Sequence, residues 1–195
     1  MTLHRVSKAD LPQDFPTHHL SMEFWENLGR AVATFGFLEK VLGKAIFVFI
    51  GTRHHNTSEE LDAQLDDLFQ KLDIALTGQL GALIDNYESA VKRHQESTVD
   101  NFGNLLKDLR KAAELRNIIC HGSWGDPDSS GASLPYFINK RKEKVITPMS
   151  SDDLARLQRH VAGLACAVID SVTCMGFQFP GLSGPGRPLL DLPYR

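Results

Sequence analysis

The chain has few cysteines, little net charge and no long apolar run. Its three cysteines among 195 residues form neither a disulfide framework nor a Cys-x-x-Cys metal pair, which is typical of a reducing compartment. The formal net charge of -3 argues against a protein that coats nucleic acid through charge alone. The longest apolar run, residues 45–50, is far too short to span a membrane, and the N-terminus lacks the apolar region of a signal peptide. We therefore expect a cytoplasmic protein without membrane contact.

The composition predicts one folded domain with extensions at both ends. Hydrophobic residues at 42% and charged residues at 23% are ordinary for a globular protein, and 195 residues suffice for a single core. We expect an N-terminal extension over residues 1–19, a helical bundle over 20–176, and a tail rich in glycine and proline over 177–195.

Four stretches of the chain repeat apolar residues three or four positions apart. This period predicts helices over residues 21–50, 58–91, 100–122 and 150–175. Gly78 and Gly81 are expected to kink or split the second stretch. Gly122 is typical of a helix end, and Ser150 followed by Asp153 is typical of an N-terminal capping box.

A change of period separates the last two predicted helices. Residues 123–131, rich in Gly, Asp and Ser, are predicted to form a loop. The β-prone runs 134–139 and 144–148 flank a charged turn and predict a small hairpin within residues 132–148. The predicted fold class is all-α, an up-down bundle of four to five helices with this hairpin inserted before the last long helix.

A column of glycines on the first predicted helix indicates close packing. Gly29, Gly36 and Gly43 are seven residues apart and share one face, although each glycine costs a helix about 1 kcal/mol relative to alanine. Another helix of the same chain or of a partner subunit would explain them. Leu115 and Ile118 on the third predicted helix project away from the stripe that carries Arg116, and these apolar side chains also need another surface to pack against. We therefore expect a homodimer.

The third predicted helix carries an arginine on its apolar stripe. Arg116 points inward there, and Asn117 and His121, four residues apart, lie on an adjoining face. A buried guanidinium needs a carboxylate, backbone carbonyls or an anionic ligand. Glu39, inward on the first helix, is expected within hydrogen-bonding distance of Arg116. Such a pair can simply fix the helix register, yet arginine has five donors and can hold a phosphate as well.

These residues resemble the R-x4-6-H motif of the HEPN superfamily of helical domains. Arg116 and His121 match its ends, Asn117 is the polar residue after the arginine, and Gly122 after the histidine is common there. The resemblance covers about residues 20–175, with the hairpin and the tail outside the minimal HEPN bundle. It implies a metal-independent endoribonuclease of the toxin or defence type that uses no cofactor and is usually a homodimer.

The resemblance also implies a role for each motif residue. His121 would exchange protons with the ribose 2′-hydroxyl or the departing 5′-oxygen, because an unperturbed histidine titrates near neutral pH. Arg116 would stabilise the extra negative charge of the transition state, and Asn117 would orient the phosphate or His121. The products would be a 2′,3′-cyclic phosphate and a 5′-hydroxyl.

A second interpretation keeps the fold without the activity. Many HEPN proteins are binding or partner modules, in which Arg116 and His121 would serve a structural or nucleotide-binding network. The candidate partners are RNA and an antitoxin or other protein. Lys140, Arg141 and Lys142 at the predicted hairpin tip would touch an RNA backbone or would simply be solvated.

Other candidate sites are less convincing from the sequence. The adjacent pairs His18–His19 and His54–His55 are expected to point apart and lack the spacing of a metal site, so we expect no metal ligands. Cys120 falls on the apolar stripe beside His121 and is expected to be a core cysteine rather than a nucleophile.

Overall fold

The computed structural model describes residues 6–53, 80–139 and 142–188, and all structural statements below concern these residues. The elements are a 3-10 turn Lys8–Asp10, helices α1 Met22–Gly51, α3 Leu80–Arg93, α4 Phe102–His121 and α5 Ser151–Thr173, and strands β1 Ser123–Pro127 and β2 Ser133–Tyr136. The described part of the chain thus confirms a helical bundle of four α-helices with a small antiparallel hairpin before the last helix. The beginning of the second predicted helix, residues 58–79, lies outside it.

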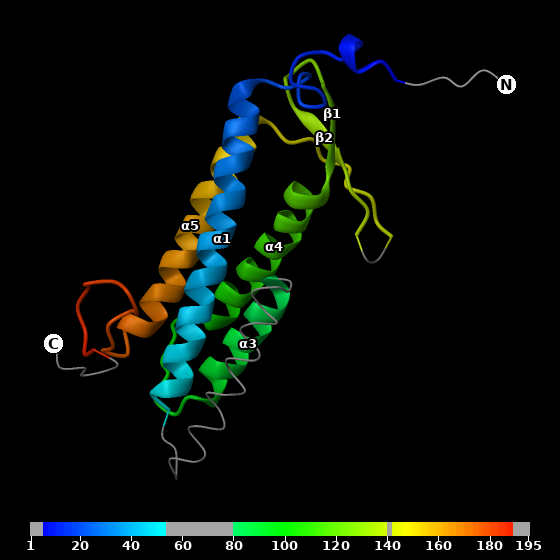
Figure 1. The fold of residues 1–195 in the computed structure, drawn as a ribbon. Coiled ribbons are helices and arrows are strands. Elements are labelled where there is room, and N and C mark those ends of the chain that lie inside the picture. The colour runs from blue at the N-terminus through cyan, green and yellow to red at the C-terminus, as the bar shows by residue number, and fades with distance from the viewer. Residues whose placement is uncertain (1–5, 54–79, 140–141, 189–195) are drawn as a thin grey trace.

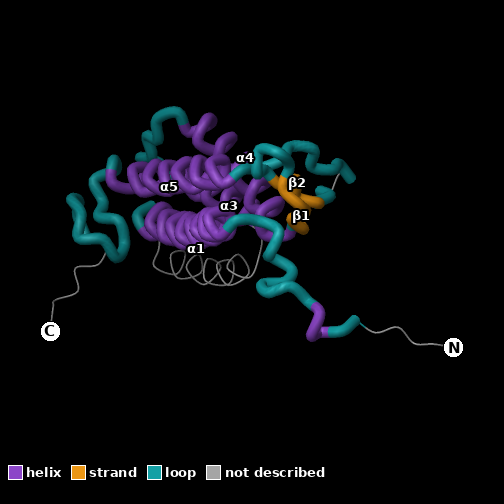
Figure 2. Tube along the Cα trace, turned by 90° about the horizontal axis from the view of Figure 1, so that it is seen from above, coloured by secondary structure: helices purple, strands orange, loops and turns teal. Residues whose placement is uncertain are grey.

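Helix α1 is the centre of the bundle. It packs along α5 and also contacts α3 and α4 (Figure 1). Helices α3, α4 and α5 alternate in direction, so α4 ends beside the hairpin at the end of the bundle where α1 begins (Figure 1). Viewed from above, the two strands lie beyond the end of the helical layers rather than between them (Figure 2).

The core follows the apolar period of α1. Its buried side chains recur three or four positions apart, as at Phe24, Leu28, Ala31, Phe35, Leu38, Leu42, Ala45 and Phe49. Residues of α3, α4 and α5 complete one continuous cluster. Phe177 and Phe179 join it with 8% and 3% of their surface exposed, so part of the segment predicted to be a tail packs into the core.

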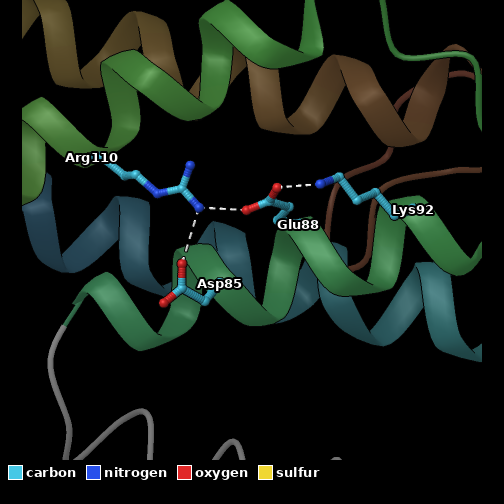
Figure 3. Close-up of polar contacts among 4 residues, drawn as sticks. All are labelled: Asp85, Glu88, Lys92 and Arg110. Carbon is cyan, nitrogen blue, oxygen red and sulfur yellow. Dashed lines mark hydrogen bonds and ion pairs between the residues drawn. The ribbon is translucent and has the colours of Figure 1, made fainter.

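Polar contacts fasten α4 to α3. Arg110 on α4 donates hydrogen bonds to Asp85 and Glu88 on α3, and Lys92 donates to Glu88 from the next helical turn (Figure 3). The hydrogen bonds from Lys92 and then Arg110 hold the pKa of Glu88 below its ordinary value, because they favour the ionised carboxylate. This network fixes the position of α4, the helix that carries the candidate site.

The end of α4 depends on close packing. Gly122, which follows His121, has an extended backbone with φ -71° and ψ 141°, and its N–H donates to Ile118 O at 2.8 Å. A Cβ atom at Gly122 would lie 2.6 Å from Ile118 O and 3.1 Å from Pro135 Cβ. Glycine is therefore needed here for the close approach of the hairpin, rather than for the left-handed conformation usual at helix ends.

The hairpin begins earlier than predicted. Residues 123–131, predicted to be a loop, contain β1, which pairs with β2 in antiparallel register. The ring of Trp124 on β1 packs edge-on against Phe24 on α1, with ring centroids 5.0 Å apart. This tertiary contact stabilises a strand whose Gly, Asp and Pro residues have poor intrinsic β propensity.

Within the predicted pairing of residues 134–139 with 144–148, the described residues form one isolated bridge, between Ile138 and Lys144, rather than a continuous strand pair. A second isolated bridge joins Ser133 to Met149, just outside these two runs. The chain from the end of β2 onward, residues 136–139 and 142–149, therefore folds back on itself, and this arm extends beside the end of α4 (Figure 1).

Candidate functional site

A groove of about 660 Å³ lies between the last turns of α4 and the arm. The helix contributes Glu114, Arg116, Asn117, Ile118 and His121 to its wall. Helical geometry places Glu114, Asn117, Ile118 and His121 on one face, because these residues are three, four and seven positions apart, and Arg116 adjoins this face. The structure thus brings Arg116, Asn117 and His121 together on one groove.

The polar side chains of this wall are available to a ligand. His121 is exposed, and Asn117 is half-buried. Within the described part of the chain, neither side chain has a hydrogen-bond partner. An imidazole and an amide are therefore open to the groove, each able to donate and to accept hydrogen bonds.

Arg116 is partly neutralised by a carboxylate of α1. Its Nη2 lies 3.7 Å from Oε1 of Glu39, and the two side chains are 23% and 24% exposed. This separation makes an ion pair but is longer than the hydrogen bond we expected from the sequence. Oε1 of Glu39 is buried and has no hydrogen-bond partner among the described residues. The guanidinium therefore does not donate to Glu39, and its N–H groups are available to a ligand.

The arm supplies the second wall. It places Phe137, Ile138, Asn139, Glu143, Lys144 and Val145 on the groove. These residues could not be connected with the site from the sequence, because nothing in their spacing shows that the arm folds back over α4. The alternation of apolar and polar positions around the turn was the one available signal.

The predicted basic tip is only partly visible. Lys142 is exposed and has a left-handed backbone with φ 62°, while Lys140 and Arg141 lie outside the described residues. Lys144, which did not figure among the predicted site residues, is the arm's cation on the groove wall. Glu143 also lines the groove, and its Oε2 accepts from Asn139 Nδ2 at 2.7 Å.

The groove has a mixed charge. Arg116 and Lys144 are cations, and Glu114 and Glu143 are carboxylates. A surface with two carboxylates at its rim does not suit a long run of phosphates. The arrangement suits one phosphate that is held by a guanidinium between neutral polar groups.

Two expectations about other side chains are wrong. Cys120 is exposed rather than in the core, and partial burial of its sulfur raises the pKa of the thiol, so it is not an activated thiolate. The rings of His18 and His19 do not point apart, because their centroids lie 3.7 Å from each other. His54 and His55 lie outside the described residues.

The described residues contain no group of three or more His, Cys, Asp or Glu side chains arranged to hold a metal ion. None of their helices combines the length and the apolar character needed to cross a membrane.

The glycine column is only partly covered within the chain. Gly43 is buried, but a Cβ atom at Gly29 or Gly36 would meet nothing within 4 Å. Leu115 packs against the core and Ile118 lines the groove, so neither needs a partner subunit for cover. Among the described residues, none approaches closely at Gly29 or Gly36.

Comparisons of this chain with protein-family models, with curated proteins and with solved structures found no match.

Proposed function

We propose that this protein is an endoribonuclease that cleaves RNA through the ribose 2′-hydroxyl. The observation that carries the proposal is the position of Arg116, Asn117 and His121 together on one open groove, with the imidazole and the amide unoccupied. Their resemblance to the HEPN motif supports the same activity. The pairing of Arg116 with Glu39 fits it, because the pair orients the guanidinium without a hydrogen bond that would compete with a phosphate.

The reaction is a transesterification. The 2′-oxygen of the substrate attacks phosphorus, the bond from phosphorus to the 5′-oxygen breaks, and a 2′,3′-cyclic phosphate and a 5′-hydroxyl result. His121 either takes the proton of the 2′-hydroxyl or gives one to the departing 5′-oxygen, and water serves at the other position. Arg116 stabilises the negative charge that builds on the phosphate oxygens, and Asn117 orients the phosphate or His121. The residues so assigned need no metal or cofactor.

The test is cleavage of single-stranded RNA by the purified protein in EDTA. A DNA oligomer of the same sequence should survive, because it lacks the 2′-hydroxyl. His121→Ala should lower the rate by about 10² to 10⁴. The matched control is His160→Ala, which removes an exposed histidine of α5 and should leave the rate unchanged. Unchanged cleavage by a folded His121→Ala variant would refute the proposal.

The Glu39–Arg116 pair also supports a second candidate, a non-catalytic binding module. In that case the pair fixes the register of α1 and α4, and the groove binds RNA or a nucleotide without chemistry. Retained RNA binding without cleavage of any RNA tried, including transfer RNA, would favour this candidate. Loss of binding in Arg116→Ala would then locate the ligand at the groove.

Homodimerisation is part of the proposal. The open face of α1 at Gly29 and Gly36, beside a Val32 that is 38% exposed, supports a second copy packing there. Sedimentation equilibrium at micromolar concentration should show a dimer for the natural protein and a monomer for Gly36→Arg. Gly163→Arg is the matched control, since this open glycine lies on α5. A monomeric natural protein would contradict the expectation.

A further inference from the structure

The arm turns an aromatic side chain toward the groove. Val145 N donates to Phe137 O at 3.1 Å, so these two residues are opposed across the arm. Phe137 and Val145 are half-buried and line the groove together with Ile138 and Lys144. Tyr136 and Ile146, the residues before Phe137 and after Val145, do not line it and are 66% and 84% exposed.

Phe137 lies apart from the core of the bundle. It does not belong to the hydrophobic core of the described residues, and no aromatic ring among them contacts it. With Val145 it gives the arm's wall an apolar surface, and Ile118 adds an apolar side chain from α4. Apolar groups beside unengaged polar groups are typical of ligand pockets, and about 660 Å³ lies within the usual size range.

The polar partners of the groove suit only part of a nucleotide. Arg116 and His121 can hold a phosphate and a ribose hydroxyl, but neither of these groups gains from contact with a phenyl ring. A nucleobase does, because every base has a flat π-face that stacks on aromatic side chains whatever its sequence. Asn117 lies on the same wall with a free amide that can bond to the edge of a base or to the sugar.

We propose that Phe137, backed by Val145 and Ile118, is a subsite for an unstacked nucleobase next to the phosphate held at Arg116. This inference rests on the proposed function, because it assigns the ligand of the same groove. The arm then selects RNA whose bases are unpaired and free to leave the stack. A paired base within a duplex cannot reach the phenyl ring.

The test compares two ligands that differ in the base. Dissociation constants for adenosine 5′-monophosphate and for ribose 5-phosphate are measured by NMR titration of the full chain. The natural protein should bind the nucleotide about tenfold more tightly than the sugar phosphate, and Phe137→Ala should lose this preference. Phe137→Trp should keep it. Tyr136→Ala is the matched control, since it removes an exposed aromatic ring of the same arm that does not line the groove.

The outcomes separate this inference from the enzyme proposal. Equal binding of the two ligands, no binding of the nucleotide, or an unchanged preference in Phe137→Ala would overturn the base subsite. If RNA is nevertheless cleaved in a His121-dependent way, the proposed activity stands without it. If the preference depends on Phe137 but no RNA is cleaved, the subsite stands and the enzyme proposal fails. Circular dichroism of each variant checks that it has folded.

Discussion

Oε1 of Glu39 on α1 is buried 3.7 Å from Nη2 of Arg116 on α4 and accepts no hydrogen bond from any described residue. An ion pair of this length attracts through charge while leaving the N–H donors of the guanidinium unused. The pair therefore holds the two helices in register and keeps the cation at the groove available. Substitutions at Glu39, Arg116, Gly122 and Tyr87 are expected to change stability or cleavage.

Replacement of Glu39 should lower stability moderately. Glu39→Ala leaves Arg116 without its carboxylate, and because both side chains are about a quarter exposed, we expect a loss of about 1 to 3 kcal/mol. Chemical denaturation measures it. The control is Glu26→Ala, which breaks the Glu26–Arg30 pair on the same helix, where both partners are about 60% exposed. A loss there of no more than about 0.5 kcal/mol is expected, and equal losses would contradict the role of the buried pair.

The planar guanidinium of Arg116 should matter beyond its charge. Arg116→Lys keeps the positive charge but replaces the fork of donors by a single ammonium, so RNA cleavage should slow by about 10². Arg30→Lys is the control, because Arg30 pairs with Glu26 on α1 and does not line the groove. It should leave the rate of cleavage unchanged. Full activity of Arg116→Lys would show that charge alone suffices.

Gly122 should not tolerate a side chain. Gly122→Ala places a Cβ atom 2.6 Å from Ile118 O, so α4 or the hairpin must shift, at a cost of about 1 to 3 kcal/mol. Cleavage should also fall, because His121 is the preceding residue. Gly103→Ala is the control, since this glycine of α4 has open space around it and should gain up to about 1 kcal/mol. Melting temperatures that move in the same direction would refute the steric argument.

Stability should fall at alkaline pH through Tyr87. Burial raises the pKa of Tyr87 to about 12 from an ordinary 10.0, and its hydroxyl donates to Ser171 Oγ at 2.8 Å. In the unfolded chain the phenol ionises near pH 10.0, while the folded protein holds the proton to about 12. Stability is therefore unaffected below pH 10.0 and decreases as the pH rises toward 12.

Tyr87→Phe isolates this effect. The variant should lose about 1 kcal/mol at neutral pH through the missing hydrogen bond, yet its stability should decline less steeply above pH 10.0. Urea denaturation across this pH interval measures both. Tyr136→Phe, which changes an exposed tyrosine, should behave like the natural protein. An unaltered alkaline slope in Tyr87→Phe would show that other groups cause the loss.

Local sequence patterns predicted the helices and the identity of the motif residues. The apolar period placed α1, α4 and α5 within a few residues of their observed bounds, because a helix must bury one face whatever it packs against. The capping box at Ser150 and Asp153 is present, since its hydrogen bonds join residues three positions apart. The inward positions of Glu39 and Arg116 could be predicted from the apolar period of their helices, because each residue falls on the face that its helix must bury.

Features that depend on distant parts of the chain could not be predicted. Strand β1 forms from residues of poor β propensity because Trp124 packs against Phe24, a contact across about half the chain. Cys120 lies on the predicted apolar stripe of α4 but is exposed. The apolar period of one helix does not show where the neighbouring helices end, and so it does not show which turns of the stripe they cover. Phe177 and Phe179 enter the core although they stand among glycines and prolines.

The sequence by itself determined that Asn117 and His121 share one face of α4 and that Arg116 lies on the adjoining face, because the 3.6-residue period fixes these directions by spacing alone. Only the tertiary structure decided that this face borders a groove and that Phe137 and Lys144 form its opposite wall. The groove forms because the path of the arm brings its residues beside α4. That path depends on the packing of Gly122 against Pro135, and no local periodicity of the sequence predicts it.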